Sequence, residues 1–320
     1  MNFLKKIEKY NSNICLIDEK NNIFTYKNIL ESSQKISKNL KTRSLIFVLP
    51  TNNIEFITSY IGFFRKELVQ MLIDPKIEVN LLENLVIKYL PTYLFVPIER
   101  NVELNDYEII LRLKHYKILK VKKEKKYLLN KNLALLLSTS GSTGSKKFVR
   151  LSYKNILSNT KSISKYLSIK KNHRTITTMP PFYTYGLSIL NTHLYTGASI
   201  LVTNMRVIEK SFWEIFDKQK ISSFGGVPYF YEILKKLRFE KKIFSNLKYF
   251  TQAGGALNIN TNKYFLKYAE KNNLKFFVMY GQTEATSRMT YLPHKFSRKK
   301  VGSIGVPIPG GKIKLINKEN

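Results

Sequence analysis

Short apolar runs that alternate with longer amphipathic segments constrain the fold of this sequence most strongly. Ser44–Leu49, Leu68–Ile73 and Tyr93–Val96 are apolar runs of strand length. Between them, Asn53–Phe64 and Leu81–Leu90 repeat apolar residues at the spacing of one helix face. This alternation is typical of parallel β-sheets that are covered by helices. The sequence therefore predicts an α/β fold with layered, parallel-type β-sheets packed with helices.

The same alternation continues through the rest of the sequence. We expect a helix after Thr25, whose side chain can accept hydrogen bonds as an N-cap residue, and a second helix from Ser152, where apolar residues recur at helical spacing. Further strands are expected at Leu133–Leu137, Ser199–Thr203, Ile221–Phe224, Leu247–Phe250 and Phe276–Met279. By contrast, the highly charged stretch Tyr107–Tyr127 is expected to be an irregular connection.

Length and composition narrow the class of protein. A chain of 320 residues predicts one large domain or two fused lobes, and 43% hydrophobic residues exclude a disordered or fibrous protein. No apolar run reaches the roughly 18 residues of a membrane span, and the N-terminus does not resemble a secretory signal. The single cysteine, Cys15, cannot form an internal disulfide, which fits a reducing compartment. We therefore expect a cytoplasmic protein.

The formal charge of +32 is large enough to suggest nucleic acid or an anionic membrane surface as a partner. However, 44 of the 54 basic residues are lysines, and they are spread along the whole sequence. Lysine is less suited than arginine to bidentate contacts with phosphates and bases. We therefore expect a solvated basic surface and no nucleic-acid partner, with a polyanion-binding protein as the alternative.

The most informative segment follows the predicted strand Leu133–Leu137. It reads Thr139-Ser140-Gly141-Ser142-Thr143-Gly144-Ser145-Lys146-Lys147. Small residues let backbone N–H groups converge on an anion, while hydroxyls add hydrogen bonds and lysine adds charge, so the loop suits phosphate oxygens. It is not a Walker A loop, because Gly144 is followed by serine rather than by Lys-Ser or Lys-Thr. A flexible connection without a ligand is the alternative.

This loop resembles the phosphate-binding signature of the acyl-adenylate-forming, or AMP-binding, enzymes, which include acyl-CoA synthetases and adenylation domains. Their pattern is close to [ST]-S-G-[ST]-T-G-x-P-K, and the loop follows it except at Lys146, where proline is usual. Without this proline the backbone before Lys147 is less restricted, so we expect the loop to be less stiff than is usual in the family. The resemblance implies a catalytic role for Lys147 and contacts with ATP phosphates for Thr139, Ser140, Gly141, Ser142, Thr143, Gly144 and Lys147.

Two further segments resemble motifs of the same family and occur in the same order. Tyr280–Glu284 (YGQTE) is similar to the YGxTE motif, and Gly302–Gly310 is similar to the GSxGxPxPG segment that follows it. The resemblance implies that Tyr280, Gly281 and Thr283 bind the nucleotide, with Thr283 at the α-phosphate in a catalytic role. It also makes Glu284 a catalytic residue and a ligand of Mg²⁺, a cation that prefers carboxylate oxygen.

Segments between these motifs resemble the substrate side of the family. Pro180–Leu187 is similar to PLFHxxGL with Tyr183 in the place of histidine, and Gly225–Pro228 is similar to the GVP turn at the acyl pocket. The resemblance implies substrate contacts for Tyr183, Gly186 and Gly226. Ordinary core aromatics and purely structural turns are the alternatives.

Gln252–Ala256 resembles the glycine-rich turn that packs against adenine in the family. Glycines allow close approach of the backbone to a flat base. The resemblance implies nucleotide contacts for Gly254, Gly255 and Ala256. His193 is expected to be a structural histidine rather than a base.

The resemblance implies a function. It is the ATP- and Mg²⁺-dependent activation of a small carboxylic acid as an acyl-adenylate, followed by transfer to a thiol of CoA or of a carrier protein. The alternative is a truncated module that binds ATP, AMP or an acyl ligand without turnover. The sequence leaves open which acid is used and the oligomeric state.

We expect residues 1–300 to form the AMP-binding core, as two β-sheet subdomains with a boundary near 190–200. Residues 301–320 would begin the following β-rich subdomain. The family's TGD motif and C-terminal lid domain are not found in the sequence. We therefore expect weak adenylation unless a separate C-terminal domain is supplied.

Overall fold

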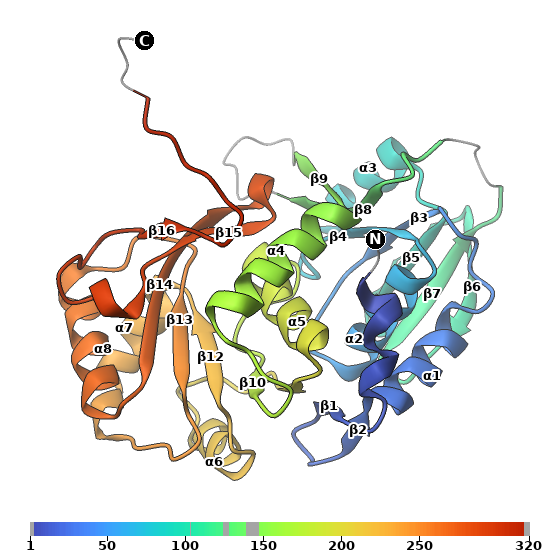
Figure 1. Cartoon of the computed structure of the whole chain (residues 1–320). Coiled ribbons are helices and arrows are strands. Elements are labelled where there is room, and N and C mark those ends of the chain that lie inside the picture. Colours follow the sequence, from blue (N-terminus) through green and yellow to red (C-terminus); the bar gives the residue numbers. More distant parts are fainter. Residues whose placement is uncertain (1–2, 103, 124–127, 139–146, 317–320) are drawn as a thin grey trace.

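The computed structural model describes residues 3–102, 104–123, 128–138 and 147–316 (Figure 1). Two β-sheets stand side by side, with helices between them and on their outer faces. The predicted layered α/β class is confirmed.

The first sheet has seven strands. They are β3 (Leu45–Val48), β4 (Val69–Leu72), β5 (Tyr93–Pro97), β6 (Tyr107–Arg112), β7 (Tyr116–Val121), β8 (Leu133–Ser138) and β9 (Phe148–Ser152). Their order is β6-β7-β5-β3-β4-β8-β9, in which β5, β3, β4 and β8 are parallel. The remaining strands join antiparallel at the two edges.

The second sheet has nine strands. They are β1 (Ile14–Ile17), β2 (Ile23–Thr25), β10 (Arg174–Ile176), β11 (Ser199–Leu201), β12 (Ser223–Gly226), β13 (Tyr249–Gln252), β14 (Lys275–Gln282), β15 (Ser287–Tyr291) and β16 (Val306–Pro307). Their order is β16-β15-β14-β13-β12-β10-β11-β1-β2. The six strands from β14 to β1 are parallel. Because β1 and β2 come from the N-terminus, this sheet combines distant parts of the sequence.

The α-helices form three layers around the sheets. Between the sheets lie α1 (Tyr26–Ser37), α2 (Ile54–Arg65), α4 (Tyr153–Tyr166) and α5 (Thr184–Thr196). The first sheet is covered on its outer face by α3 (Val79–Tyr89). The outer face of the second is covered by α6 (Lys210–Lys218), α7 (Pro228–Lys236) and α8 (Ile259–Lys271). Short 3-10 helices are η1 (Phe3–Tyr10), η2 (Phe239–Lys241), η3 (Thr283–Ala285) and η4 (His294–Phe296).

The largest apolar core joins both sheets. It contains Ile46 and Phe95 from the first sheet, Leu16 and Ile200 from the second, and Leu190 from α5. Burial of apolar surface in a shared core stabilises the two sheets together. The predicted subdomain boundary near 190–200 stays a prediction.

Local sequence explains where two central helices begin. The Thr25 side chain accepts a hydrogen bond from the N–H of Asn28, and Ser152 does the same with Asn155. Each asparagine also accepts from the backbone of its cap residue, which completes a reciprocal cap. The predicted starts of α1 and α4 are therefore confirmed.

The prediction of an irregular connection at Tyr107–Tyr127 is wrong for its described part. Residues Tyr107–Val121 form the hairpin β6–β7, which adds two antiparallel strands beside β5. Ile118 and Leu119 are buried, whereas β6 lies at the edge with most of its residues exposed. The charges that suggested a loop are compatible with an edge hairpin that has one solvated face.

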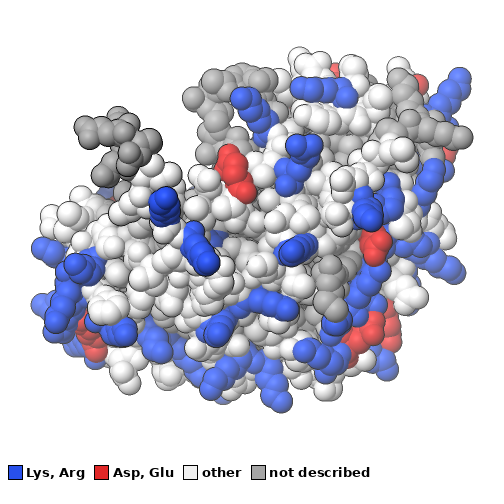
Figure 2. Space-filling view, turned by 45° about the horizontal axis from the view of Figure 1, so that its top comes forward, with Lys and Arg blue, Asp and Glu red and all other residues white. Residues whose placement is uncertain are grey.

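The basic residues are dispersed over the surface. Figure 2 shows lysine and arginine side chains scattered over one face, with uncharged surface between them. Within the described parts of the chain, no helix combines the length and apolar character needed to cross a bilayer.

Gly62 in α2 marks a close approach between α1 and α2. A Cβ atom at this position would stand 2.5 Å from the carbonyl oxygen of Ser33, which belongs to the backbone and cannot rotate away. We predict that Gly62→Ala lowers the free energy of unfolding by about 1–3 kcal/mol in urea titrations. Helix propensity alone predicts the opposite, a gain of about 1 kcal/mol. Ser32→Ala on the exposed face of α1 is the control, and an unchanged Gly62→Ala variant would contradict this packing.

Candidate active site

Three of the predicted motifs meet at one edge of the second sheet. The strands β12, β13 and β14 are parallel and in register, so that Gly226 pairs with Gln252 and Gln252 pairs with Val278. The turns that follow these strands therefore lie along the same carboxyl edge. Ligands of open parallel sheets bind at this edge.

Thr283 lies at the N-terminus of α5. It begins η3 directly after β14, and its Oγ1 atom is 3.3 Å from Oγ1 of Thr184, the first residue of α5. The N-cap residue Tyr183 makes no side-chain cap, and among the described residues no side chain accepts a hydrogen bond from the first N–H groups of the helix. The N-terminus of a helix of this length stabilises negative charge. Two hydroxyls and an open helix end are suited to a phosphate or carboxylate oxygen.

Lys147 and Glu284 are two exposed charges that belong to neighbouring elements. Lys147 directly precedes β9, which packs against η3, where Glu284 is located. Neither residue takes part in an ion pair of the described chain. Both charges therefore remain available to a ligand. The other predicted loop residues, Thr139, Ser140, Gly141, Ser142, Thr143 and Gly144, lie outside the described residues.

A magnesium ion would have a limited set of protein ligands here. The described part of the chain contains no cluster of three acidic, histidine or cysteine side chains that could hold a metal. Mg²⁺ is commonly bound through one or two carboxylates, with phosphate oxygens and water as its other ligands. The exposed carboxylate of Glu284 fits that mode.

The glycine-rich turn after β13 forms an exposed backbone surface. Gly254 has a φ of 83°, a left-handed conformation that favours glycine. The Nε2 atom of buried Gln252 donates to the carbonyl oxygen of Gly255 at 2.8 Å, whereas its Oε1 atom has no partner. Gly254, Gly255 and Ala256 are exposed, and Tyr280 at the end of β14 is 42% exposed. An open peptide surface at a glycine-rich turn allows a flat base to approach the backbone closely.

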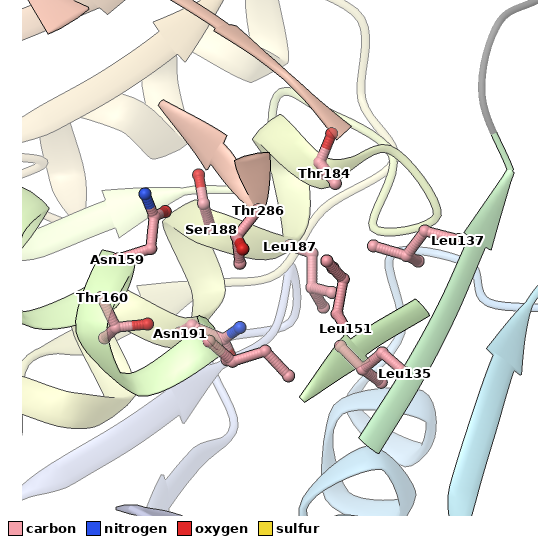
Figure 3. A pocket seen from close by; sticks show the side chains of 11 residues that line it. Leu135, Leu137, Leu151, Asn159, Thr160, Thr184, Leu187, Ser188, Asn191 and Thr286 are labelled. Carbon is pink, nitrogen blue, oxygen red and sulfur yellow. The ribbon is translucent and has the colours of Figure 1, made fainter. Parts of the chain in front are cut away.

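A small cavity connects this edge to the first sheet (Figure 3). Its volume is about 10 Å³, near the room that one water molecule needs. Thr184 and Ser188 of α5, Asn159 of α4 and Thr286 line it together with Leu137 of β8. Because Leu137 comes just before the predicted phosphate loop, the cavity lies close to where that loop leaves the sheet.

The predicted substrate residues lie in two environments. Tyr183 is 49% exposed at the start of α5. A Cβ atom at Gly186 would stand 2.3 Å from the carbonyl oxygen of Pro180, and one at Gly226 would stand 2.4 Å from the ring of Phe230. Close packing therefore explains both glycines, and their substrate contacts stay predictions.

The segment Gly302–Gly310, the last of the family motifs in the sequence, lies next to the strand that follows the YGQTE motif. Val306 and Pro307 form the edge strand β16 beside β15, and Ser162 of α4 donates to the carbonyl oxygen of Pro309 at 2.6 Å. This hydrogen bond connects the segment around Pro309 to α4, in the layer of helices between the sheets.

Tyr185 is a buried residue next to Thr184 that the sequence did not single out as part of the site. Its buried hydroxyl donates to the carbonyl oxygen of Thr251 at 2.9 Å and lies 2.7 Å from Thr251 Oγ1. A Cβ atom at Gly225 would stand 2.7 Å from the same hydroxyl. Burial raises the pKa of Tyr185, so it stays protonated. Tyr185 therefore fills the space between α5 and the strands β12 and β13, where the sequence offered only an aromatic residue.

Arg288 is a second residue that sequence reasoning missed. It follows Glu284 by four residues and is 2% exposed in β15. A basic residue four positions after the motif was the only available signal.

His193 has the structural role that was expected. It is buried in α5, and its Nδ1 atom lies 2.8 Å from the carbonyl oxygen of Ile189. Burial lowers its pKa to about 4, so the ring is neutral at physiological pH.

The sequence matches the AMP-binding enzyme family over residues 3–320, which is nearly the whole chain. The chain belongs to this family. The match agrees with the phosphate loop, the YGQTE segment and the turn after β13, which are three separate parts of the sequence.

Relatives of the family differ in the acid that their names specify. A 2-succinylbenzoate–CoA ligase of Oceanobacillus iheyensis is 26% identical over 58% of this chain and 38% of its own length. A long-chain-fatty-acid–CoA ligase of Bacillus subtilis is 28% identical over 59% of this chain and 33% of its own length. These alignments span little more than a third of the curated relatives.

A solved structure shows the same fold. It is the O-succinylbenzoate coenzyme A synthetase of Bacillus subtilis in complex with ATP and magnesium ion. The similarity has a TM-score of 0.78 at 17% identity and covers 100% of this chain and 67% of that protein. The fold is therefore shared.

Buried histidines predict a loss of stability in acid. The pKa of His193 and that of His173 are both lowered to about 4 by burial, below the ordinary value of 6.5. Unfolding therefore takes up protons between roughly pH 6.5 and 4, and the free energy of unfolding falls as the pH decreases through this window. We predict that His193→Gln reduces this slope by up to about 1.4 kcal/mol per pH unit in denaturant titrations. An unaltered slope in His193→Gln would contradict the prediction.

Proposed function

We propose that this chain activates a small carboxylic acid with ATP as an acyl-adenylate, for transfer to a thiol of CoA or of a carrier protein. The observation that carries the proposal is the meeting of Thr283 with the open N-terminus of α5, in a chain that belongs to the AMP-binding family. Thr283 follows β14, and the exposed turn Gly254–Ala256 follows the neighbouring parallel strand β13.

The proposed chemistry is a substitution at phosphorus. A carboxylate oxygen attacks the α-phosphorus of ATP, a new oxygen–phosphorus bond forms, and pyrophosphate leaves with the electrons of the broken bond. The hydroxyls of Thr184 and Thr283 would donate to the reacting oxygens, and Lys147 would offset negative charge at the phosphates. Positioned donors of this kind stabilise charge that develops in the transition state.

Glu284 is the proposed ligand of Mg²⁺, and the bound ion would neutralise phosphate charge. Tyr280, Gly281, Gly254, Gly255 and Ala256 are proposed to contact the nucleotide, while Tyr183, Gly186 and Gly226 are proposed to border the acid.

The acid is proposed to be small. Buried Tyr185 directly follows Thr184 in α5 and reaches Thr251 on β13, so its ring fills the space between the helix and the strand. A long acyl chain would have to displace this hydrogen-bonded ring. The relatives are named for different acids, so their substrates do not identify the one used here.

A separate C-terminal domain or a carrier protein is proposed as a partner; the chain covers 67% of the solved synthetase of Bacillus subtilis. A reducing, cytoplasmic setting is also proposed, since Cys15 is a free, buried thiol. A module that binds nucleotide without turnover differs from the proposed enzyme in one respect, because it would not release pyrophosphate.

Binding of Mg·ATP tests the nucleotide site on which the proposal depends, and release of pyrophosphate from bound ATP and an acid then separates the enzyme from a binding module. Ligand at about 100 times its dissociation constant should stabilise the protein by about 2.7 kcal/mol, which appears as a rise in melting temperature. Thr283→Ala should weaken binding by about ten- to a hundredfold, because it removes a hydrogen bond to a charged group. Exposed Glu31→Ala on α1 should bind as the wild type does. A wild-type protein that shows no shift at any concentration would contradict the proposal.

The role of Glu284 has a separate readout. We predict that Mg²⁺ strengthens ATP binding to the wild-type protein, and that this dependence is lost in Glu284→Gln because the carboxylate is gone. Titration of ATP with and without Mg²⁺ measures it. Equal dependence on Mg²⁺ in Glu284→Gln would show that the ion is held elsewhere.

A further inference from the structure

Arg288 is a buried cation for which the described chain supplies no counter-charge. Arg288 is 2% exposed, and it takes part in none of the ion pairs among the described residues. Transfer of an unpaired charge from water to a protein interior is costly unless a charged partner or strong hydrogen bonds compensate. The burial of this guanidinium therefore needs an explanation.

The contacts of Arg288 are all with neutral groups. Its Nε atom donates to Ser188 Oγ at 3.2 Å, its Nη1 atom lies 3.8 Å from Met279 Sδ, and its Cζ atom lies 5.0 Å from the ring centre of Tyr185. Nearby Tyr166 does not supply a negative charge, because burial raises its pKa to about 12. A guanidinium has five N–H donors, so these contacts leave hydrogen-bonding capacity for a ligand.

A β-bulge points Arg288 into the layer between the sheet and α5. In the pairing of β14 with β15, Met279 lies opposite Tyr291 and Gly281 lies opposite Arg288. Met289 is the extra residue, so Tyr291 and Arg288 project from the same face although they are three positions apart. Bulges beside functional sites re-aim side chains in this way.

Ser188, which accepts a hydrogen bond from the guanidinium, lies one helical turn away from the proposed reaction point. Thr184 meets Thr283 at the start of α5, and Ser188, the hydrogen-bond partner of Arg288, comes four residues later. One turn of helix spans about 5.4 Å. The helix end and Ser188, the hydrogen-bond partner of the buried cation, are therefore separated by about one turn along α5, a span that a short molecule can bridge.

We propose that Arg288 determines substrate specificity by binding the second carboxylate of a short dicarboxylic acid, whose first carboxylate is adenylated beside Thr184 and Thr283. This rests on the proposed function. Only the first carboxylate forms a bond to phosphorus, and the second stays ionised and pairs with the guanidinium. Arginine suits this role because its planar donors match both oxygens of a carboxylate. Tyr185, which stacks against the guanidinium, limits the length of the acid.

A panel of matched acids tests the proposal. Malonate, succinate and glutarate are compared with butanoate and with succinamate, which resembles succinate but has one neutral end. Each acid is added to the protein with Mg·ATP, and the melting temperature and pyrophosphate release are measured. We expect at least one dicarboxylate to bind about thirtyfold or more tightly than its monocarboxylate or monoamide counterpart.

Substitutions of Arg288 distinguish a role in recognising the acid from a role in folding. Arg288→Met should lose the preference for dicarboxylates while keeping the response to Mg·ATP, and Arg288→Lys should keep part of the preference. Without ligand, Arg288→Met should melt at the wild-type temperature or higher, because replacement of a buried unpaired charge by an apolar side chain is often neutral or stabilising. Exposed Arg112→Met should behave as the wild type does.

The outcomes distinguish the two proposals. A wild-type protein without any response to Mg·ATP would contradict the proposed function itself. A clear response to Mg·ATP with equal binding of dicarboxylates and their monocarboxylate counterparts would overturn only the role of Arg288. An Arg288→Met variant that melts several degrees lower yet keeps the dicarboxylate preference would also overturn it, as a sign of a purely structural residue. Should this variant fail to fold, the wild-type panel and Arg288→Lys still decide.

Discussion

The parallel register of β12, β13 and β14 is the constraint on which the site depends. Hydrogen bonds between parallel strands fix where each strand ends relative to its neighbours. As a result, three turns that are far apart in the sequence open at the same edge. A shift in this register would separate the turn at Gly254 from Thr283, although every residue of both motifs would still be present.

The helix α5 connects the two halves of the proposed chemistry. Its first residue, Thr184, meets Thr283, while Tyr185 and Ser188 contact the strands and the buried cation behind them. The helix is held in the core between the two sheets, where Leu187, Leu190 and Leu194 are buried. Rigid placement of this kind positions donors with little loss of entropy on binding. One buried helix therefore orders both the phosphate end and the acid end of the site.

The sequence predicted those parts of the fold whose signals are local. Strands such as Tyr93–Pro97 are continuous apolar runs, and Thr25 and Ser152 cap helices through residues three positions away. The hairpin β6–β7 was missed because its charged residues are stabilised by position at a sheet edge, which local composition does not report. The three-residue strand β10 was missed because it depends on its neighbours in the sheet.

The residues of the candidate site also differ in whether a local sequence pattern identifies them. Motif residues such as Thr283 and Gly254 could be singled out because their types and order form a pattern. Tyr185 and Arg288 carry no such pattern, since their importance comes from contacts across elements 100 residues apart, as between Ser188 and Arg288. The bulge at Met289 is likewise visible only in the pairing of β14 with β15.

The central claim is that one edge of the second sheet holds an acyl-adenylate. A crystal structure of the chain with a non-hydrolysable acyl-sulfamoyl adenosine tests it most directly. The account predicts the sulfamoyl group within hydrogen-bond distance of the Thr184 and Thr283 hydroxyls, and the adenine against Gly254–Ala256. A ligand bound elsewhere on the molecule, or one whose sulfamoyl group lies away from both hydroxyls, would contradict the account.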